Sequence, residues 1–186
     1  MSTIIYKIDL FTHWHAGSGL YGGTNANLTV IRNQAGLPFI PGKTLKGLIR
    51  EGAEAINSLI PDLVTNQFID TIFGQEDKVH SICFFSNAEL SRKFSENVRD
   101  KQKQYLYTTI ASTAIDAMGM AKDQSLRQME VTLPLVLYGS IEHFPNIPGY
   151  EMQLSYCLQW IKKLGHRRTR GFGRCELSIY QPQSNL

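Results

Sequence analysis

Cysteine is scarce in this sequence, and its placement excludes two common kinds of stabilising site. The chain has three cysteines, which are far apart and form no CxxC pair. An odd number at such spacings predicts neither a disulfide framework nor a cysteine zinc site. We expect Cys83, Cys157 and Cys175 to be reduced thiols packed in the interior of a cytoplasmic protein.

Long apolar runs are also lacking. No stretch approaches the roughly 20 apolar residues that a membrane helix needs. The first residues alternate apolar and polar side chains and include Asp9, so they lack the apolar core of a signal peptide. The sequence therefore predicts no membrane partner.

A strong excess of one charge is missing as well. The 186 residues carry a formal net charge of +3, and 42% of them are hydrophobic. This composition supports a buried core and argues against wholesale disorder. The length fits one domain over residues 1–186. A net charge this small does not indicate a nucleic-acid partner, so that case depends on where the charges lie.

The signature motifs of common enzymes do not occur either. There is no HExxH pattern, and residues 42–44 end like a phosphate loop but have Leu37 where its first glycine would stand. His13 and His15 are spaced to share one face of a strand, where they could bind a metal or exchange protons. Without a supporting metal pattern, a surface pair is the simpler interpretation. No cofactor is expected.

Strands and helices alternate along the chain, which predicts an α+β fold. Pro134 lies within an alternating segment, residues 129–141, and favours an edge strand there. A helix opens at Pro148, has Trp160 and Leu164 on its apolar face, and ends at Gly165. The other expected elements are strands at 4–11, 28–32 and 81–85, helices at 43–56 and 62–73, and an exposed helix or loop at 91–104.

The clearest helix start lies in residues 37–56. Pro38 and Pro41 hold the approach extended, and apolar residues then recur at helical spacing. Three cations, Lys43, Lys46 and Arg50, are spaced to stand together on another face. Lysines beside the exposed amides of a helix N-terminus make an anion site, although a solvated basic face is the alternative.

The densest cluster of charge is the segment KKLGHRRTRGFGR, residues 162–174. It holds six of the chain's 19 lysines and arginines within thirteen residues, interleaved with glycines. Arginine matches phosphate with two hydrogen bonds, and glycine lets the backbone approach a ligand closely. The segment therefore predicts binding of RNA or another polyanion.

Five segments resemble, in order, motifs of the RAMP superfamily, and specifically the seven-family backbone subunits of type III CRISPR complexes. The proline-bounded segment resembles the family's PxIPGSSLKGxxR pattern, with Lys43-Thr44 in place of the small pair. The full set is HAGSG at 15–19, LPFIPGKTLKGLIRE at 37–51, IFG at 72–74 with FFSNAEL at 84–90, TAIDAMGMAKDQSLRQMEV at 113–131, and RRTRGFGR at 167–174.

This resemblance implies a ferredoxin-like, RRM-related core that carries a thumb β-hairpin at about residues 107–130. Such subunits polymerise along a guide RNA, and each thumb wedges into the guide–target duplex. The implied partners are guide RNA (crRNA), complementary target RNA, further copies or related RAMP subunits, and other CRISPR effector subunits. The RNA-binding residues expected from the motifs and the charge are Lys43, Thr44, Lys46, Arg50, Met118, Met120, Lys122, Arg127, His166, Arg167, Arg168, Arg170 and Arg174.

One departure bears on catalysis. Slicing members carry an aspartate about five residues before the arginine of a V-I-R-like strand, and Asn27 stands at that distance from Arg32. An amide is neither a base nor a strong ligand for a hard metal, so we expect binding without a catalytic or metal site.

Two alternatives remain open. One is a RAMP endoribonuclease that cleaves precursor guide RNA with His13, His15 or His166 as base. The other is a slicer of target RNA that takes its acid from Asp116 or Asp123.

Overall fold

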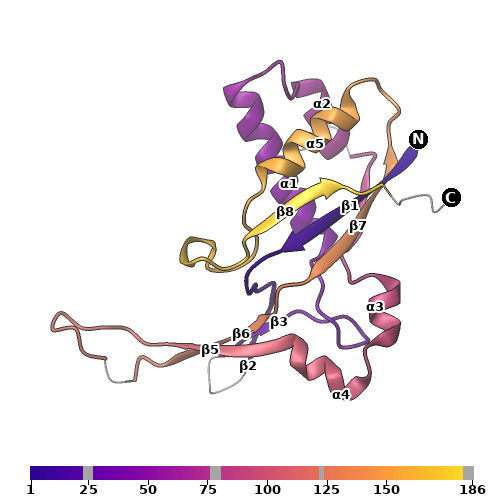
Figure 1. Ribbon diagram of the computed structural model, residues 1–186. Helices are drawn as coiled ribbons and strands as arrows, with labels where there is room; N and C mark the ends of the chain where they lie inside the picture. Colours follow the sequence, from indigo (N-terminus) through magenta and orange to yellow (C-terminus); the bar gives the residue numbers. More distant parts are fainter. Residues whose placement is uncertain (23–26, 76–80, 122–123, 182–186) are drawn as a thin grey trace.

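Two four-stranded sheets organise the molecule, one beneath a layer of helices and one that leads into a long arm (Figure 1). The computed structural model describes residues 1–22, 27–75, 81–121 and 124–181. Within these residues, none of the helices combines the length and the apolar character that crossing a bilayer requires.

The first sheet is antiparallel, with strand order β4-β7-β1-β8. Tyr6, Ile8 and Leu10 alternate along β1 and are buried beneath the helices, as their spacing predicts. The elements run β1-α1-β4-β7-α5-β8 along the chain, which is the βαββαβ order of a ferredoxin-like fold. The strands are β1 (Ser2–Leu10), β4 (Phe84–Phe85), β7 (Val136–Phe144) and β8 (Cys175–Ile179).

Helices cover one face of this sheet (Figure 1). Helix α1 turns Leu45, Ile49 and Ile56 into the core, as the helical spacing predicts, whereas Leu48 is only half-buried. The helices are α1 (Gly42–Leu59), α2 (Asn66–Phe73) and α5 (Tyr150–Trp160). Burial raises the pKa of the Cys157 and Cys175 thiols to about 12, so these buried cysteines stay protonated and inert.

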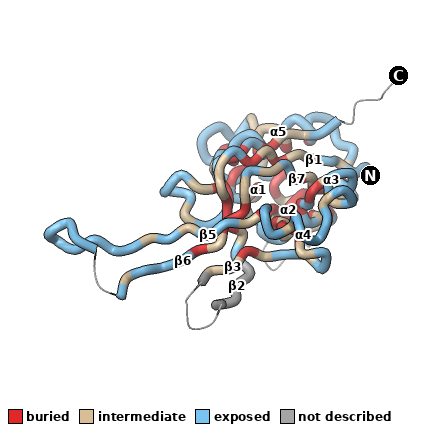
Figure 2. Tube along the Cα trace, turned by 60° about the horizontal axis from the view of Figure 1, so that its bottom comes forward, coloured by how far each residue is buried: buried red, intermediate tan, exposed pale blue. Residues whose placement is uncertain are grey.

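The second sheet has strand order β2-β3-β6-β5 and pairs the early strands with the arm. Strands β5 and β6 form an antiparallel hairpin, while β3 and β6 run parallel. The hairpin extends into an arm that is exposed over most of its length, with buried residues only near its root (Figure 2). The strands are β2 (Gly17–Gly22), β3 (Asn27–Val30), β5 (Tyr107–Ser112) and β6 (Arg127–Thr132). The α+β class with a ferredoxin-like core and a hairpin arm is thus confirmed.

Short helical segments complete the chain. Residues 91–104, expected as an exposed helix or loop, form α3 (Arg92–Asn97) and α4 (Asp100–Lys103), followed by the 3-10 turn η2 (Gln104–Leu106). A further 3-10 turn, η3 (Arg168–Arg170), lies in the basic segment.

The edge-strand prediction for residues 129–141 is wrong. Pro134 lies between β6 and β7, which belong to different sheets. Strand β7 is an interior strand, because β4 pairs with its outer side. The proline therefore ends one strand before the next begins, where no ladder needs its missing amide hydrogen.

Two further boundaries differ from expectation. Helix α5 ends at Trp160, whose side chain is 48% exposed, so Leu164 and Gly165 belong to the following loop. In the segment 81–85 only Phe84–Phe85 is strand, and Phe84 is exposed. The apolar character of a residue in a short element does not by itself predict that it is buried, because apolar atoms also cover much of a protein surface.

Candidate nucleic-acid interface

A cavity of about 900 Å³ lies where the start of α1 meets the basic segment. Lys43 and Thr44 line it from the first turn of α1, and His166 and Arg168 line it from the basic segment. His15 contributes from the segment between the two sheets. The fold therefore brings together two segments that each predict anion binding and lie more than a hundred residues apart.

The start of α1 is pressed against the segment that contains β4. The Gly42 amide donates to Asn87 Oδ1 at 3.0 Å, and a β-carbon at Gly42 would lie 2.0 Å from the Phe85 carbonyl oxygen. The first turn carries no acidic residue. First-turn amides lack intrahelical acceptors and carry the positive end of the helix dipole, so an anion near Lys43 and Thr44 would be stabilised.

The expected basic face of α1 is divided in the structure. Lys43 lines the cavity, but Lys46 lies 5.9 Å from the centroid of the Phe85 ring, and burial lowers its pKa. Arg50 donates to Glu54 at 2.7 Å across one helical turn. This pair was not predicted from the sequence, although an arginine four residues before a glutamate on a helix is a signal that could have found it. Lys43 is thus the cation of this helix that faces the cavity.

Glycines fold the basic segment back onto the first strands. The Leu164 amide donates to the Gly173 carbonyl at 2.9 Å, and the Gly173 amide donates to the His13 carbonyl at 2.8 Å. A β-carbon at Gly173 would lie 1.8 Å from the Leu164 oxygen, and one at Gly165 would lie 2.5 Å from the His15 oxygen. These contacts require glycine, and they hold the arginines of the loop in one place.

The tip of this loop reaches the root of the arm. Both terminal nitrogens of Arg167 donate to Ser112 Oγ, at 3.2 and 3.3 Å. Ser112 pairs in register with Arg127 on β6, so Arg127 shares that face of the sheet. Arg168 and Arg170 are exposed within η3. Arg167 therefore links the loop to the arm, and Arg168 and Arg170 stay open to a ligand.

Arg174 lies apart from these residues. It borders a different cavity of about 420 Å³, together with Lys162 and Lys163. Its amide donates to Thr12 Oγ1 at 3.0 Å. The cations of the basic segment are thus divided between two cavities.

His15 is not part of a surface pair, so that interpretation of His13 and His15 is wrong. The His15 side chain is 2% exposed, and its Nδ1 donates to the Glu130 carbonyl at 2.7 Å. Its ring lies 5.9 Å from the ring of His166, edge to face. The neighbouring Trp14 forms an isolated bridge with Thr132, so residues 13–15 do not alternate as a regular strand. A buried histidine beside a basic loop could not be identified from spacing.

Burial lowers the pKa of His15, and the nearby His166 and Arg167 act in the same direction. Because its pKa is lowered, His15 in the folded protein takes up a proton at a lower pH than in the unfolded chain, where the ordinary value is about 6.5. Above that pH His15 does not favour unfolding. As the pH falls below it, the unfolded chain binds the proton more readily, so the stability of the folded protein declines.

We expect the free energy of unfolding, measured in urea, to fall as the pH is lowered through about 6. His15→Asn keeps a donor for the Glu130 carbonyl but cannot titrate, so its stability should decline less. His143→Asn, at an exposed position, is the matched control and should decline like the wild type. Identical pH profiles for all three proteins would contradict the role given to His15.

The tip of the arm presents two methionines to solvent. Met118 is 86% and Met120 is 61% exposed, so neither packs in the core. Asp116 Oδ1 accepts hydrogen bonds from the amides of both residues at 2.9 Å, and Gly119 takes a positive φ of 81°. These bonds hold the backbone of the turn that carries the methionines, and they use the carboxylate that was one candidate slicer acid.

Some expectations lie beyond the described residues. Lys122 and the other candidate acid, Asp123, fall outside them. Asn27 begins β3 and pairs with Gly22. Within the described residues, no group of three histidine, cysteine or acidic side chains could hold a metal ion.

Comparisons with known proteins agree with this architecture. A sequence model described as the RAMP superfamily matches residues 7–176. A chain from the cryo-electron microscopy structure of the type III-B Cmr-beta bound to cognate target RNA is similar, with a TM-score of 0.70. The alignment covers 96% of this chain and 97% of that one at 14% sequence identity, so it shows the fold. No match is found among curated proteins.

Proposed function

Because this chain belongs to the RAMP superfamily, we propose that it is a guide-RNA-binding backbone subunit of a type III CRISPR effector complex. Its partners would be crRNA, complementary target RNA, further copies or related RAMP subunits, and other effector subunits. The structure that it resembles is that of the type III-B Cmr-beta bound to cognate target RNA. We propose binding rather than cleavage, because an asparagine occupies the position where slicing relatives carry an aspartate.

One observation carries the proposal, namely the cavity that joins the start of α1 to the basic loop. Lys43 and Arg168 are charged groups that suit phosphate oxygens, and the helix amides add a fixed positive end. Arg167 and Arg127 extend the positive surface onto the arm. Phosphate contacts of this kind bind RNA with little dependence on its sequence.

The arm supplies the second half of the proposed function. In the assembled complex the Met118 and Met120 side chains would press against bases, because they are apolar, flexible and exposed on a turn whose backbone is bonded to Asp116. We expect chemical probing of bound guide–target duplex to detect bases that are disturbed at a regular spacing. Replacing both methionines with alanine should reduce that signal while guide affinity changes little.

The matched control replaces Met152 with alanine, since that methionine is exposed on α5 away from the arm. It should leave the regular pattern intact. A pattern that survives loss of both tip methionines would show that the tip does not contact the duplex. Failure of the wild-type complex to retain guide RNA would overturn the proposed function itself.

A second candidate is a metal-independent RAMP endoribonuclease, which the pairing of His15 with His166 favours. Nδ1 of His15 is a donor to a carbonyl, so Nε2 is the acceptor in the neutral ring, as a general base needs. Cleavage of precursor RNA in the presence of a chelator, lost in His15→Asn, would support this candidate. Intact RNA under the same conditions supports the binding role.

A further inference from the structure

A second polar cavity lies at the root of the arm, and the basic loop does not border it. Its volume is about 350 Å³. Register places Thr109 opposite Glu130, and Ser112 opposite Arg127. Since side chains alternate along a strand, Thr109 and Glu130 lie on the face opposite Ser112 and the basic loop. The residues that line this cavity are Arg32, Gly36, Lys103, Gln104, Tyr107, Thr108, Thr109 and Glu130.

The central feature of this cavity is an arginine stacked on an aromatic ring. Arg32 Cζ lies 3.9 Å from the centroid of the Tyr107 ring, and Arg32 Nη2 donates to Glu130 Oε1 at 2.5 Å. The Arg32 side chain is still 43% exposed. The ring covers part of the guanidinium, and the exposed remainder is what a ligand can reach.

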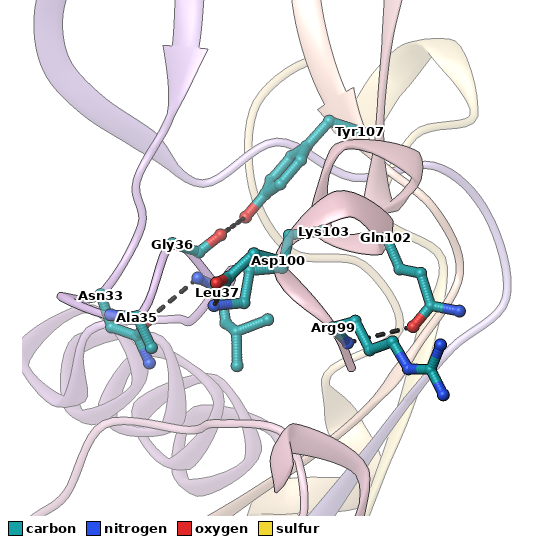
Figure 3. A network of polar contacts seen from close by, with 9 residues as sticks. All are labelled: Asn33, Ala35, Gly36, Leu37, Arg99, Asp100, Gln102, Lys103 and Tyr107. Atoms are coloured by element: carbon teal, nitrogen blue, oxygen red, sulfur yellow. Dashed lines mark hydrogen bonds and ion pairs between the residues drawn. The ribbon is translucent and has the colours of Figure 1, made fainter. Parts of the chain in front are cut away.

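Neighbouring contacts hold this stack in position. The Tyr107 hydroxyl donates to the Gly36 carbonyl at 2.8 Å, as Figure 3 shows. Burial raises the pKa of Tyr107 to about 12, so the hydroxyl remains a donor. Glu130 Oε2 accepts from the Val30 amide at 3.0 Å, which fixes the carboxylate that holds Arg32. A planar group fixed in this way loses little entropy when a second planar group stacks on it.

The surroundings suit a phosphate and a sugar rather than one particular base. Each Glu130 oxygen already accepts one hydrogen bond, from Arg32 or from the Val30 amide, so the carboxylate is held in place beside the arginine. Lys103 pairs with Asp100 at 2.7 Å, but the Asp100 side chain is 94% exposed (Figure 3). Solvent around Asp100 weakens the pair, so Lys103, itself 23% exposed, can exchange it for a phosphate. Thr108 and Thr109 add exposed hydroxyls.

We propose that the Arg32–Tyr107 stack is a platform for one unpaired base of the bound RNA, with Lys103 at the neighbouring phosphate. Unpaired bases commonly stack on guanidinium planes in proteins that bind single-stranded RNA. This inference rests on the proposed function and adds a contact on the other face of the arm's root. Nucleic acid would then touch the arm on both sides.

The test compares Arg32→Lys, Arg32→Ala and the control Arg92→Ala in complexes assembled on guide RNA. Arg32→Lys keeps a cation beside Glu130 but removes the plane, and Arg92 is an exposed arginine of α3. The RNA probes carry a single abasic nucleotide placed at successive positions. Affinity is measured by titration, and thermal melting checks that each variant folds.

We expect both Arg32 variants to bind intact guide about tenfold more weakly than the wild type, and the control to bind normally. An abasic nucleotide at the platform position should weaken the wild type by a similar factor but add nothing to the loss in Arg32→Lys. Wild-type affinity in Arg32→Lys, or losses that simply add at every position, would overturn the platform alone. A wild-type protein that retains no guide RNA would overturn the proposed function together with it.

Discussion

Replacing Arg168 and Arg170 together with alanine should weaken RNA binding by the order of 100-fold, because each charge-assisted contact to phosphate contributes about 1.5 kcal/mol or more. Both side chains are exposed within η3, and Arg168 lines the cavity beside α1. The dependence of affinity on salt should also become shallower, since fewer counterions are displaced from the RNA. A titration series at several salt concentrations measures both effects.

The matched control removes two cations elsewhere. Arg92 and Lys93 are exposed in α3, and their replacement with alanine changes the net charge by the same amount. If the control pair weakens RNA binding as much as the loop pair, the effect reflects the overall charge of the protein and not the loop. Arg167 is left intact in both variants, because its bonds to Ser112 give it a structural role.

Gly173→Ala should cost about 3 kcal/mol of folding stability. An added β-carbon would lie 1.8 Å from the Leu164 carbonyl oxygen, in a residue whose φ is +65°. Neither backbone can give way easily, because Leu164 and Gly173 are hydrogen-bonded to one another and Gly173 to His13. Urea unfolding of the purified protein measures the loss.

Gly171→Ala separates the close contact from the backbone conformation. Gly171 has a φ of +84°, and nothing lies within 4 Å of the position that a β-carbon would take. This change should therefore cost only about 1 kcal/mol, the penalty for placing a side chain in the left-handed region. Equal losses in the two variants would show that the contact between Gly173 and Leu164 is not what stabilises the loop.

Local patterns predicted the elements whose signals lie close together in the sequence. Alternation identified β1, and two prolines followed by helical spacing placed the start of α1. These signals reflect side chains that one sheet or one helix buries on a single face. The glycines of the basic loop were equally informative. A β-carbon at Gly165 or Gly173 would lie too close to a backbone carbonyl oxygen.

Features that depend on distant residues could not be found in this way. Pro134 indicated an edge strand because sheet membership is decided by pairing partners that the segment itself does not contain. His15 is buried by Glu130 and His166, which lie more than a hundred residues further along the chain. The stack of Arg32 on Tyr107 likewise joins residues from distant parts of the sequence. The sequence thus indicated the separate segments of the candidate site, and the structure shows how they are arranged.

The parallel pairing of β3 with β6 has a consequence for how the protein folds. The Val30 amide and the Glu130 carboxylate that join these strands are 100 residues apart, and the His15–Glu130 bond spans 115. Closing loops of that length is slow, because their entropy is lost before the contact forms. The root of the arm should therefore acquire hydrogen-exchange protection later than α1 during refolding, so that the proposed RNA-binding surface would be completed as one of the last steps of folding.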